Sequence, residues 1–207
     1  YLLLPIQEGS KEGQVKLETG SPADTEMDIR LAIDSVEYYV PFALTQSEGG
    51  ATVTIRNVAA DALCWDSIKV SDTFDTTNRD KFRPLYHHTP LYGWMNDANG
   101  LVYKDGEYHL FYQHNPYGRL WGNMHWGHAV SSDLFHWEYK EEAMFLDMDG
   151  AMFSGCAVVD HNNVSGLKEG DETPILFFYT CAGEKKSTQC LAYSTDAGKT
   201  LKKNDKN

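Results

Sequence analysis

The dipeptide Asp105-Gly106 constrains the fold of this chain more than any other feature, because it lies between two runs of strand-forming residues, 101–104 and 107–113. An Asp-Gly connection of two residues favours the primed turn types that join adjacent antiparallel strands. The sequence therefore predicts a β-hairpin at this point. Its second strand is expected to return Gln113 towards the residues that precede the first strand.

The segment before this hairpin combines an aromatic ring, an amide and a carboxylate in the order Gly93-Trp94-Met95-Asn96-Asp97-Ala98-Asn99-Gly100. The face of Trp94 can stack on the apolar side of a sugar ring, and Asn96 can hydrogen-bond sugar hydroxyls. Asp97 can act as a base, a nucleophile or a charge stabiliser. Asn, Asp and Gly also favour turns, so a plain turn is the alternative interpretation of this segment.

Further motifs follow in a fixed order along the chain. They are Phe111-Tyr112-Gln113-His114-Asn115-Pro116, Trp121-Gly122, Trp126-Gly127-His128-Ala129-Val130-Ser131-Ser132-Asp133-Leu134 and Phe153-Ser154-Gly155-Cys156-Ala157-Val158. Together with segment 93–100, this ordered set resembles the β-fructosidases of glycoside hydrolase family 32, which include invertases, inulinases and levanases. The resemblance covers residues 82–200 and depends on the order and spacing of the motifs rather than on any one of them.

The resemblance implies a role for each matching residue. The family carries its nucleophile on the Asp of W-M-N-D-P-N-G, which corresponds to Asp97. Ala98 replaces the usual Pro and Cys156 replaces the usual Ser, and neither change removes a reacting group. Pro fixes one backbone dihedral, so the segment with Ala98 is expected to be less rigid. Contacts with fructose are implied for Trp94, Met95, Asn96, Gln113, Trp121, Phe153 and Ser154.

The second carboxyl group of a retaining glycosidase is missing from the chain. Such enzymes need two carboxyl groups about 5–5.5 Å apart, a nucleophile and an acid/base. The family carries its acid/base Glu in an E-C motif and a stabilising Asp in R-D-P, and neither motif occurs after Phe153. The triplet Arg79-Asp80-Lys81 precedes the nucleophile and lacks the Pro, so it is not given this role. Four other acids are expected to be solvated strand-end and loop charges: Glu138, Glu141, Glu142 and Asp149.

The family fold is a five-bladed β-propeller, in which each blade is a four-stranded sheet. Strand patterns at 101–104, 107–113, 125–131 and 137–142 account for one blade, and those at 153–160, 174–180 and 189–194 begin a second, followed by a turn at 196–201. The sequence thus predicts an all-β chain with fewer than two propeller blades. Because it also starts at Tyr1 rather than Met, we expect it to be a piece of a longer enzyme or the product of a truncated open reading frame.

The first eighty residues carry short alternating strand patterns separated by Gly, Ser, Asp and Pro, at 14–18, 27–34, 37–44, 51–57 and 67–70. They predict a small antiparallel β-sandwich over residues 1–80, ahead of a partial propeller over 81–207. The boundary is expected within 72–83.

No residue of this sandwich is assigned catalytic chemistry. We expect Asp28, Arg30 and Lys69 on polar strand faces, and Tyr38, Tyr39 and Trp65 in a core. Carbohydrate binding by this domain is the alternative.

The net charge and the composition limit the classes of molecule that this chain can bind. The net charge of −12 argues against a nucleic-acid partner, which would need clustered Lys and Arg, but suits a neutral fructan or sucrose-like carbohydrate. No apolar run approaches the ~20 residues needed to span a membrane. No cofactor and no metal are expected, because His125 and His128 lack the spacing to share one strand face. We expect an extracytoplasmic, bacterial protein.

The four cysteines do not predict a disulfide scaffold. Cys181 and Cys190 could face one another across a hairpin and pair, with buried thiols as the alternative. Cys64 and Cys156 are expected to be small apolar packing residues.

Three classes of function remain open: part of a fructose-releasing hydrolase or a related fructosyltransferase, a non-catalytic fructan-binding protein, and a structural or domain-swapped fragment.

Overall fold

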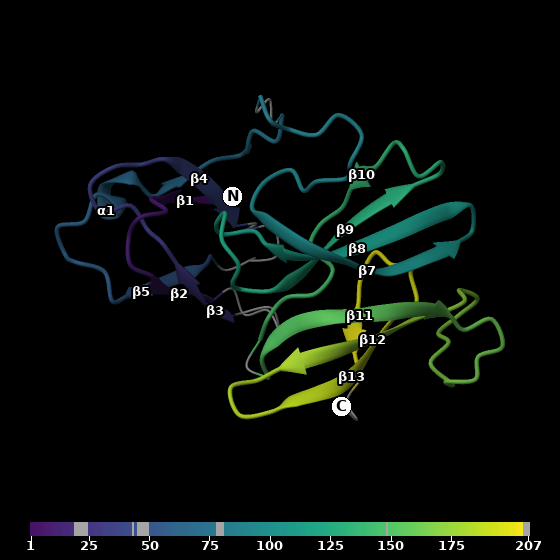
Figure 1. Cartoon of the computed structure of the whole chain (residues 1–207). Helices are drawn as coiled ribbons and strands as arrows, with labels where there is room; N and C mark the ends of the chain where they lie inside the picture. The colour runs from purple at the N-terminus through teal and green to yellow at the C-terminus, as the bar shows by residue number, and fades with distance from the viewer. Residues whose placement is uncertain (19–24, 43, 45–49, 78–80, 148, 205–207) are drawn as a thin grey trace. The chain divides into compact units, whose positions relative to one another are not determined.

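The computed structural model describes residues 1–18, 25–42, 44, 50–77, 81–147 and 149–204. Within these residues the chain is all-β apart from one short helix, and its strands form four sheets (Figure 1). The chain divides into two compact units. Unit 1 comprises Tyr1–Arg83, Leu91–Trp94 and Asn115–Asn123, and unit 2 comprises Pro84–Pro90, Met95–His114 and Met124–Asn207.

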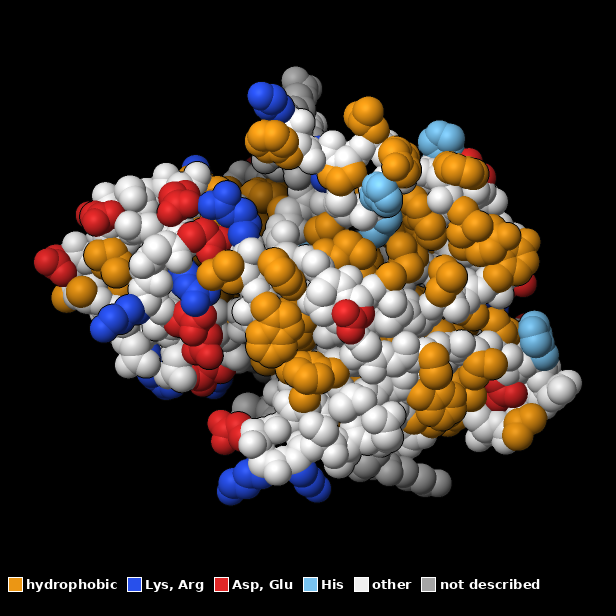
Figure 2. Space-filling model, in the orientation of Figure 1, with side chains coloured by type: hydrophobic (Ala, Val, Ile, Leu, Met, Phe, Trp, Pro, Cys, Tyr) orange, Lys and Arg blue, Asp and Glu red, His pale blue; other side chains and the backbone are white. Residues whose placement is uncertain are grey.

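Unit 1 contains two three-stranded sheets, with strand orders β4-β1-β6 and β3-β2-β5. Both consist of antiparallel pairs, and both contribute fully buried side chains, such as Leu4 from β1 and Val15 from β2. On the face shown in Figure 2, acidic and basic side chains are interleaved over this unit. Its elements are β1 (Leu2–Ile6), β2 (Gly13–Glu18), β3 (Thr25–Ile29), β4 (Tyr38–Phe42), β5 (Thr52–Arg56), α1 (Cys64–Ser67) and β6 (Lys69–Val70).

Strand β1 is absent from the sequence predictions. All five of its residues are buried, so the run has no apolar–polar alternation to mark it as a strand. The strand predicted at 27–34 ends at Ile29, and Leu31 beyond it forms only an isolated bridge to Ile6. The strand predicted at 67–70 is reduced to β6, because α1 occupies the residues before it. Residue 43 of the strand predicted at 37–44 lies outside the described residues, as do residues 78–80 of the boundary predicted within 72–83.

The aromatic core predicted for this unit is partly wrong. Trp65 is 43% exposed, and its indole nitrogen donates a hydrogen bond to the carbonyl of Ala59 at 2.8 Å. Tyr38 and Tyr39 are half-buried. Lys69 is exposed, as predicted, with its ammonium 3.9 Å from the centre of the Tyr39 ring.

Unit 2 is built from two four-stranded sheets with strand orders β10-β9-β8-β7 and β11-β12-β13-β14. The predicted hairpin is present between β7 and β8, and Asp105 and Gly106 both have positive φ, 51° and 95°, as the type I′ turn requires. The strands are β7 (Trp94–Lys104), β8 (Glu107–Asn115), β9 (His125–Ser131), β10 (Glu138–Tyr139), β11 (Ala151–Val159), β12 (Ile175–Ala182), β13 (Ser187–Ser194) and β14 (Lys202–Lys203).

Strand β14 corrects the expectation of fewer than two blades. The sequence pattern indicated three strands followed by a turn, whereas Lys202 and Lys203 pair with Tyr193 and Ala192 and give the second sheet its fourth strand. A strand of two residues is too short to produce a detectable alternation. The described residues of unit 2 therefore form two complete four-stranded sheets.

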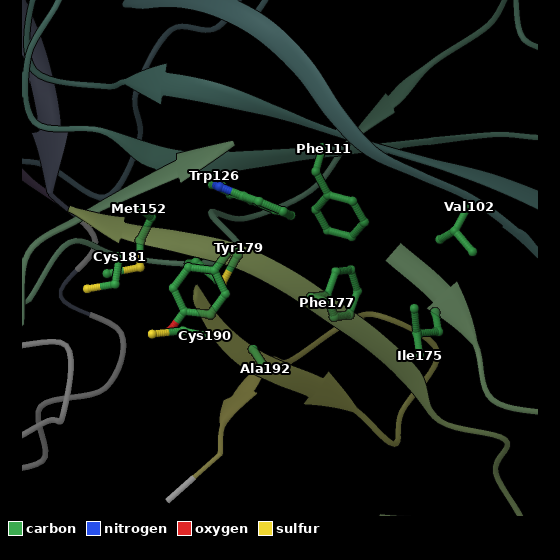
Figure 3. Close-up of a cluster of buried hydrophobic side chains, with 11 residues drawn as sticks. Val102, Phe111, Trp126, Met152, Ile175, Phe177, Tyr179, Cys181, Cys190 and Ala192 are labelled. Atoms are coloured by element: carbon green, nitrogen blue, oxygen red, sulfur yellow. The ribbon is translucent and has the colours of Figure 1, made fainter. Parts of the chain in front are cut away.

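The two sheets of unit 2 share one apolar core, shown in Figure 3. Phe111 of β8 and Trp126 of β9 are fully buried and meet Phe177 of β12 in edge-on contacts, with ring centres 5.0 Å and 6.4 Å apart. Such edge-to-face pairs contribute about 0.5–1.5 kcal/mol beyond the burial of their surface. This core fixes β8 and β9 against β11 and β12.

All four cysteines are free thiols. Cys190 lies opposite Tyr179 and Cys181 lies opposite Thr188, so the two cysteines are diagonal rather than facing neighbours. Cys64 is buried as predicted, but Cys156 is exposed, because its position on β11 points away from the core. No helix in the described ranges has the length and apolar character needed to cross a membrane.

Candidate active site

Asp97 is an exposed residue of β7 whose carboxylate accepts two hydrogen bonds. Ser154 Oγ donates to Oδ2 at 2.9 Å, and Asn96 Nδ2 donates to Oδ1 at 3.3 Å. The hydrogen bond from Ser154, and then that from Asn96, lowers the pKa of Asp97 below its ordinary value, because both donors favour the charged form. The carboxylate is therefore ionised at neutral pH and open to solvent, as a nucleophile must be.

The segment that carries Asp97 is not a plain turn. It belongs to the continuous strand β7, which runs to Lys104, so the turn interpretation is wrong. Gly100 supplies the one irregularity, with φ of 55°. A side chain there would place its Cβ 2.9 Å from the Trp126 ring and 3.1 Å from the Phe111 ring. Glycine thus lets β7 lie directly against the core.

Ser154 reaches Asp97 because β11 contains a β-bulge. Phe153 pairs with Thr180 and Gly155 pairs with Tyr179, which leaves Ser154 as the extra residue between them. A bulge redirects the side chain of the extra residue, and bulges are common next to active sites. A Cβ at Gly155 would lie 1.9 Å from the carbonyl oxygen of Phe178, so this geometry requires glycine.

Two buried side chains hold the same part of β11 from the neighbouring sheet. Gln113 is 2% exposed, and its Nε2 donates to the carbonyl of Met152 at 2.8 Å. Trp126 is fully buried, and its Nε1 donates to the carbonyl of Phe153 at 3.2 Å. Trp126 received no role from the sequence, although it opens one of the motifs behind the resemblance. Its indole is a positioning group for Phe153, the residue immediately before the bulge.

The remaining predicted residues lie in different surroundings. Met95 is half-buried and packs against the cluster of Leu110, Tyr112 and Ala129. Trp94 and Trp121 belong to unit 1: Trp94 is half-buried at the start of β7, and Trp121 is 59% exposed. Hydrogen bonds therefore bring Asn96, Asp97 and Ser154 together. Gln113 and Phe153 are linked to this group through β11, because Gln113 bonds the carbonyl of Met152 and Trp126 bonds the carbonyl of Phe153.

The acids considered as solvated charges divide into two groups. Glu138 is exposed and pairs with Lys140, and Glu141 and Asp149 are exposed, as predicted. Glu142 differs, because its side chain is only 17% exposed and its Oε1 lies 2.7 Å from Nδ1 of the buried His114. It is a structural partner of His114 rather than a solvated charge. Asp80 lies outside the described residues.

A pair of histidines lies inside unit 2. Nδ1 of His109 is 3.1 Å from Nε2 of His128, and both side chains are buried. Burial, and then the neighbouring His109, lowers the pKa of His128 to about 3, so it is neutral at physiological pH. Within the described part of the chain, no three His, Cys, Asp or Glu side chains are grouped in a way that would hold a metal ion.

Comparison with known proteins gives a consistent result. The family model described as "Glycosyl hydrolases family 32 N-terminal domain" matches residues 87–207, and one described as "Domain of unknown function (DUF4980)" matches residues 1–86. A levanase of Bacillus subtilis (strain 168) is 52% identical over 134 residues, which cover 64% of this chain and 20% of the levanase. An extracellular exo-inulinase of Aspergillus awamori is 43% identical over 137 residues, which cover 58% of this chain and 26% of the inulinase.

Solved structures show the same relationship. The β-fructofuranosidase of Schwanniomyces occidentalis complexed with fructosyl-erythritol has a TM-score of 0.58 and 42% identity, covering 60% of this chain and 26% of that one. The chain thus spans about a fifth to a quarter of the length of these relatives. The predicted fold class, an N-terminal β-sandwich followed by the first blades of a propeller, is confirmed. With its family model matching residues 87–207, this chain belongs to glycoside hydrolase family 32.

Proposed function

We propose that this chain is the N-terminal part of a retaining β-fructosidase in which Asp97 is the nucleophile. The observation that carries the proposal is the pair of hydrogen bonds that Ser154 and Asn96 donate to the exposed, ionised carboxylate of Asp97. The relatives named levanase and exo-inulinase support the same chemistry. We also infer that residues 1–80 form a separate sandwich domain and residues 81–207 the propeller part.

The reaction follows from the charge on Asp97. Its carboxylate attacks C2 of a terminal β-linked fructose, the bond from C2 to the leaving oxygen breaks, and a general acid gives that oxygen a proton. Water then attacks C2 and loses a proton to the same group, the bond between C2 and the Asp97 carboxylate breaks, and fructose is released with its configuration retained. The resemblance assigns the general acid to a Glu in an E-C motif, which does not occur after Phe153 in these 207 residues. We therefore expect no hydrolysis from the 207-residue chain alone.

The sugar contacts are assigned from the hydrogen-bonding groups and apolar surfaces of each side chain. Asn96 and Gln113 would bind ring hydroxyls, and the amide nitrogen of Gln113 already bonds Met152, which leaves its Oε1 to accept from the sugar. Phe153 would form a pocket wall, and the resemblance gives Trp94 and Trp121 contacts with the sugar. Each polar contact that tightens in the transition state contributes on the order of 1–3 kcal/mol.

Neutral fructans or sucrose-like sugars suit a chain of net charge −12, and no cofactor is required. We infer an extracytoplasmic location, since the Aspergillus awamori relative is named extracellular, and a bacterial source like that of the Bacillus subtilis levanase.

The test compares Asp97→Asn with Asp149→Asn in the whole enzyme, because both replacements keep the side-chain shape and Asp149 is an exposed acid. Asp97→Asn should lower fructose release from levan, inulin and sucrose by roughly 10³-fold or more. Asp149→Asn should keep normal turnover. Near-normal release by Asp97→Asn would refute the nucleophile assignment, and fructosyl transfer to sugar acceptors in place of free fructose would favour the transferase alternative.

A further inference from the structure

The segment Asn115–Asn123, which carries Trp121, is tied to the N-terminal sheets within unit 1. The backbone nitrogen of Arg119 donates to Glu8 Oε1 at 2.7 Å, and its guanidinium donates to Glu37 Oε2 at 2.9 Å. The same guanidinium lies 4.7 Å from the centre of the Tyr38 ring, and Tyr38 hydrogen-bonds Glu8. Nε of Arg119 also donates to Glu8 Oε1 at 3.4 Å, so this one side chain joins the segment to two separate loops of the sandwich.

Two further contacts fix the ends of the same segment. The ring of Tyr117 stacks on that of Phe42 from β4, with centres 4.5 Å apart and planes at 8°. The amide of Asn123 donates to the backbone carbonyl of Asp28 at 2.8 Å and accepts from its backbone nitrogen at 3.1 Å. Because the bonds to Asn123 use only the backbone of Asp28, the Asp28 carboxylate is free to point elsewhere.

A pocket of about 270 Å³ lies between this segment and strand β3. Its lining includes Trp121 on one side and Glu12, Asp28 and Arg30 of the sandwich on the other. Trp121 is 59% exposed, and Arg30 bonds Glu12 at 2.8 Å. Among the described residues, the carboxylate of Asp28 makes no hydrogen bond or ion pair. The polar strand face predicted for Asp28 and Arg30 is therefore one wall of a pocket.

We propose that this pocket is a sugar-binding subsite that the N-terminal sandwich builds together with Trp121. The indole offers an apolar face for one side of a sugar ring, and the carboxylate of Asp28 accepts hydrogen bonds from a pair of neighbouring hydroxyls. Arg30, held by Glu12, donates to a hydroxyl or ring oxygen. The pocket is close to the lower limit of about 300 Å³ for ligand sites, which suits one sugar residue.

The ligand is a fructosyl residue of a neutral fructan, an assignment that depends on the proposed function. The lining carries three carboxylates, those of Glu8, Glu12 and Asp28, against the one guanidinium of Arg30, so an anionic sugar or a phosphate is disfavoured. The sandwich accordingly determines substrate specificity instead of serving only as a spacer.

Binding is measured by calorimetry on the 207-residue chain carrying Asp97→Asn, with β-2,6- and β-2,1-linked fructotriose as probes and maltotriose as the comparison sugar. Asp28→Asn and Trp121→Ala should each weaken binding of a fructotriose about tenfold. Asp66→Asn is the matched control, since Asp66 is an exposed acid of unit 1 outside the pocket, and should bind like the parent. Melting curves confirm that each variant is folded.

Three results would overturn the subsite: no saturable fructotriose binding by the parent, unchanged binding by Asp28→Asn, or equal binding of maltotriose. The outcome is separable from the proposed function. If Asp28→Asn weakens fructotriose binding but the enzyme releases no fructose, the proposed hydrolase function is refuted and the proposed subsite stands. If Asp97→Asn abolishes fructose release but Asp28→Asn has no effect on fructotriose binding, the hydrolase function stands and the subsite is refuted.

Discussion

Ser154 Oγ donates a hydrogen bond to Asp97 Oδ2 at 2.9 Å, and so links two strands, β11 and β7, that belong to different sheets. The two residues are 57 positions apart in the chain. The bond depends on the bulge in β11, and it is the first cause of the lowered pKa of Asp97. The fold of unit 2 therefore sets both the position and the ionisation of the proposed nucleophile.

Replacing Ser154 with Ala should raise the pKa of Asp97, because the carboxylate loses a donor that stabilises its charged form. The acid limb of the pH profile for kcat/KM in the whole enzyme should then move to higher pH. Because Asp97 is exposed, we expect only about a tenfold loss of activity at neutral pH. Ser154→Thr keeps the hydroxyl and is the control. An unchanged acid limb in Ser154→Ala would show that this bond does not control the ionisation of Asp97.

Gly155→Ala should destabilise the chain, because the added Cβ would lie 1.9 Å from the carbonyl oxygen of Phe178. The cost should reach the upper part of the ~1–3 kcal/mol range for overpacking, and the bulge should be lost with it. Gly9→Ala is the control, since nothing lies within 4 Å of a Cβ at Gly9. Chemical denaturation measures both variants, and equal midpoints would mean that the bulge does not need glycine.

The buried pair His109–His128 should make the chain less stable in acid. The pKa of His128 is lowered from 6.5 to about 3 in the folded protein, so between these values the unfolded chain binds a proton that the folded chain excludes. The free energy of unfolding should therefore fall as the pH falls from 6.5 towards 3. This one histidine should contribute about 1.4 kcal/mol to that fall for each pH unit.

Denaturant titrations at about pH 7.5 and about pH 5 measure this dependence. His128→Gln should reduce it, whereas His87→Asn, at an exposed position, should leave it unchanged. If His128→Gln shows the same pH dependence of stability as the parent, other groups cause that dependence.

Arg119→Ala should weaken fructotriose binding without much change in the melting temperature. The variant removes the side-chain bonds to Glu8 and Glu37, so the segment that carries Trp121 loses its orientation. Arg119 is 59% exposed, and exposed ion pairs contribute only about 0–1 kcal/mol to stability. Arg56→Ala removes a comparably exposed pair with Glu26 and is the matched control. Equal binding by the two variants would show that the anchor has no role in sugar binding.

The sequence predicted the parts of the structure that depend on local patterns. The Asp105-Gly106 turn requires positive φ at both residues, and the strands predicted on either side of it are present, although β7 begins seven residues earlier than predicted. Strand β1 and strand β14 were missed for opposite reasons, since one is buried throughout and the other has only two residues. Neither produces the alternation on which strand prediction depends.

The roles missed in the site depend on contacts between distant residues. Nothing in the sequence near Trp126 indicates that its indole would bond the carbonyl of Phe153, and nothing near Asp28 indicates a pocket shared with Trp121. The bulge at Ser154 follows from the register of β11 against β12, which is a property of the pair. Such roles appear only when the sheets are assembled.

In the proposed mechanism Asp97 forms a covalent bond with fructose. Rapid quenching of the whole enzyme with a fructan, followed by peptide mass spectrometry, detects this bond. A peptide that contains Asp97 should gain the mass of one fructosyl group, and the Asp97→Asn variant should yield no such peptide. A fructosyl group on another residue, or fructose release with inverted configuration and no labelled peptide, would show that Asp97 is not the nucleophile.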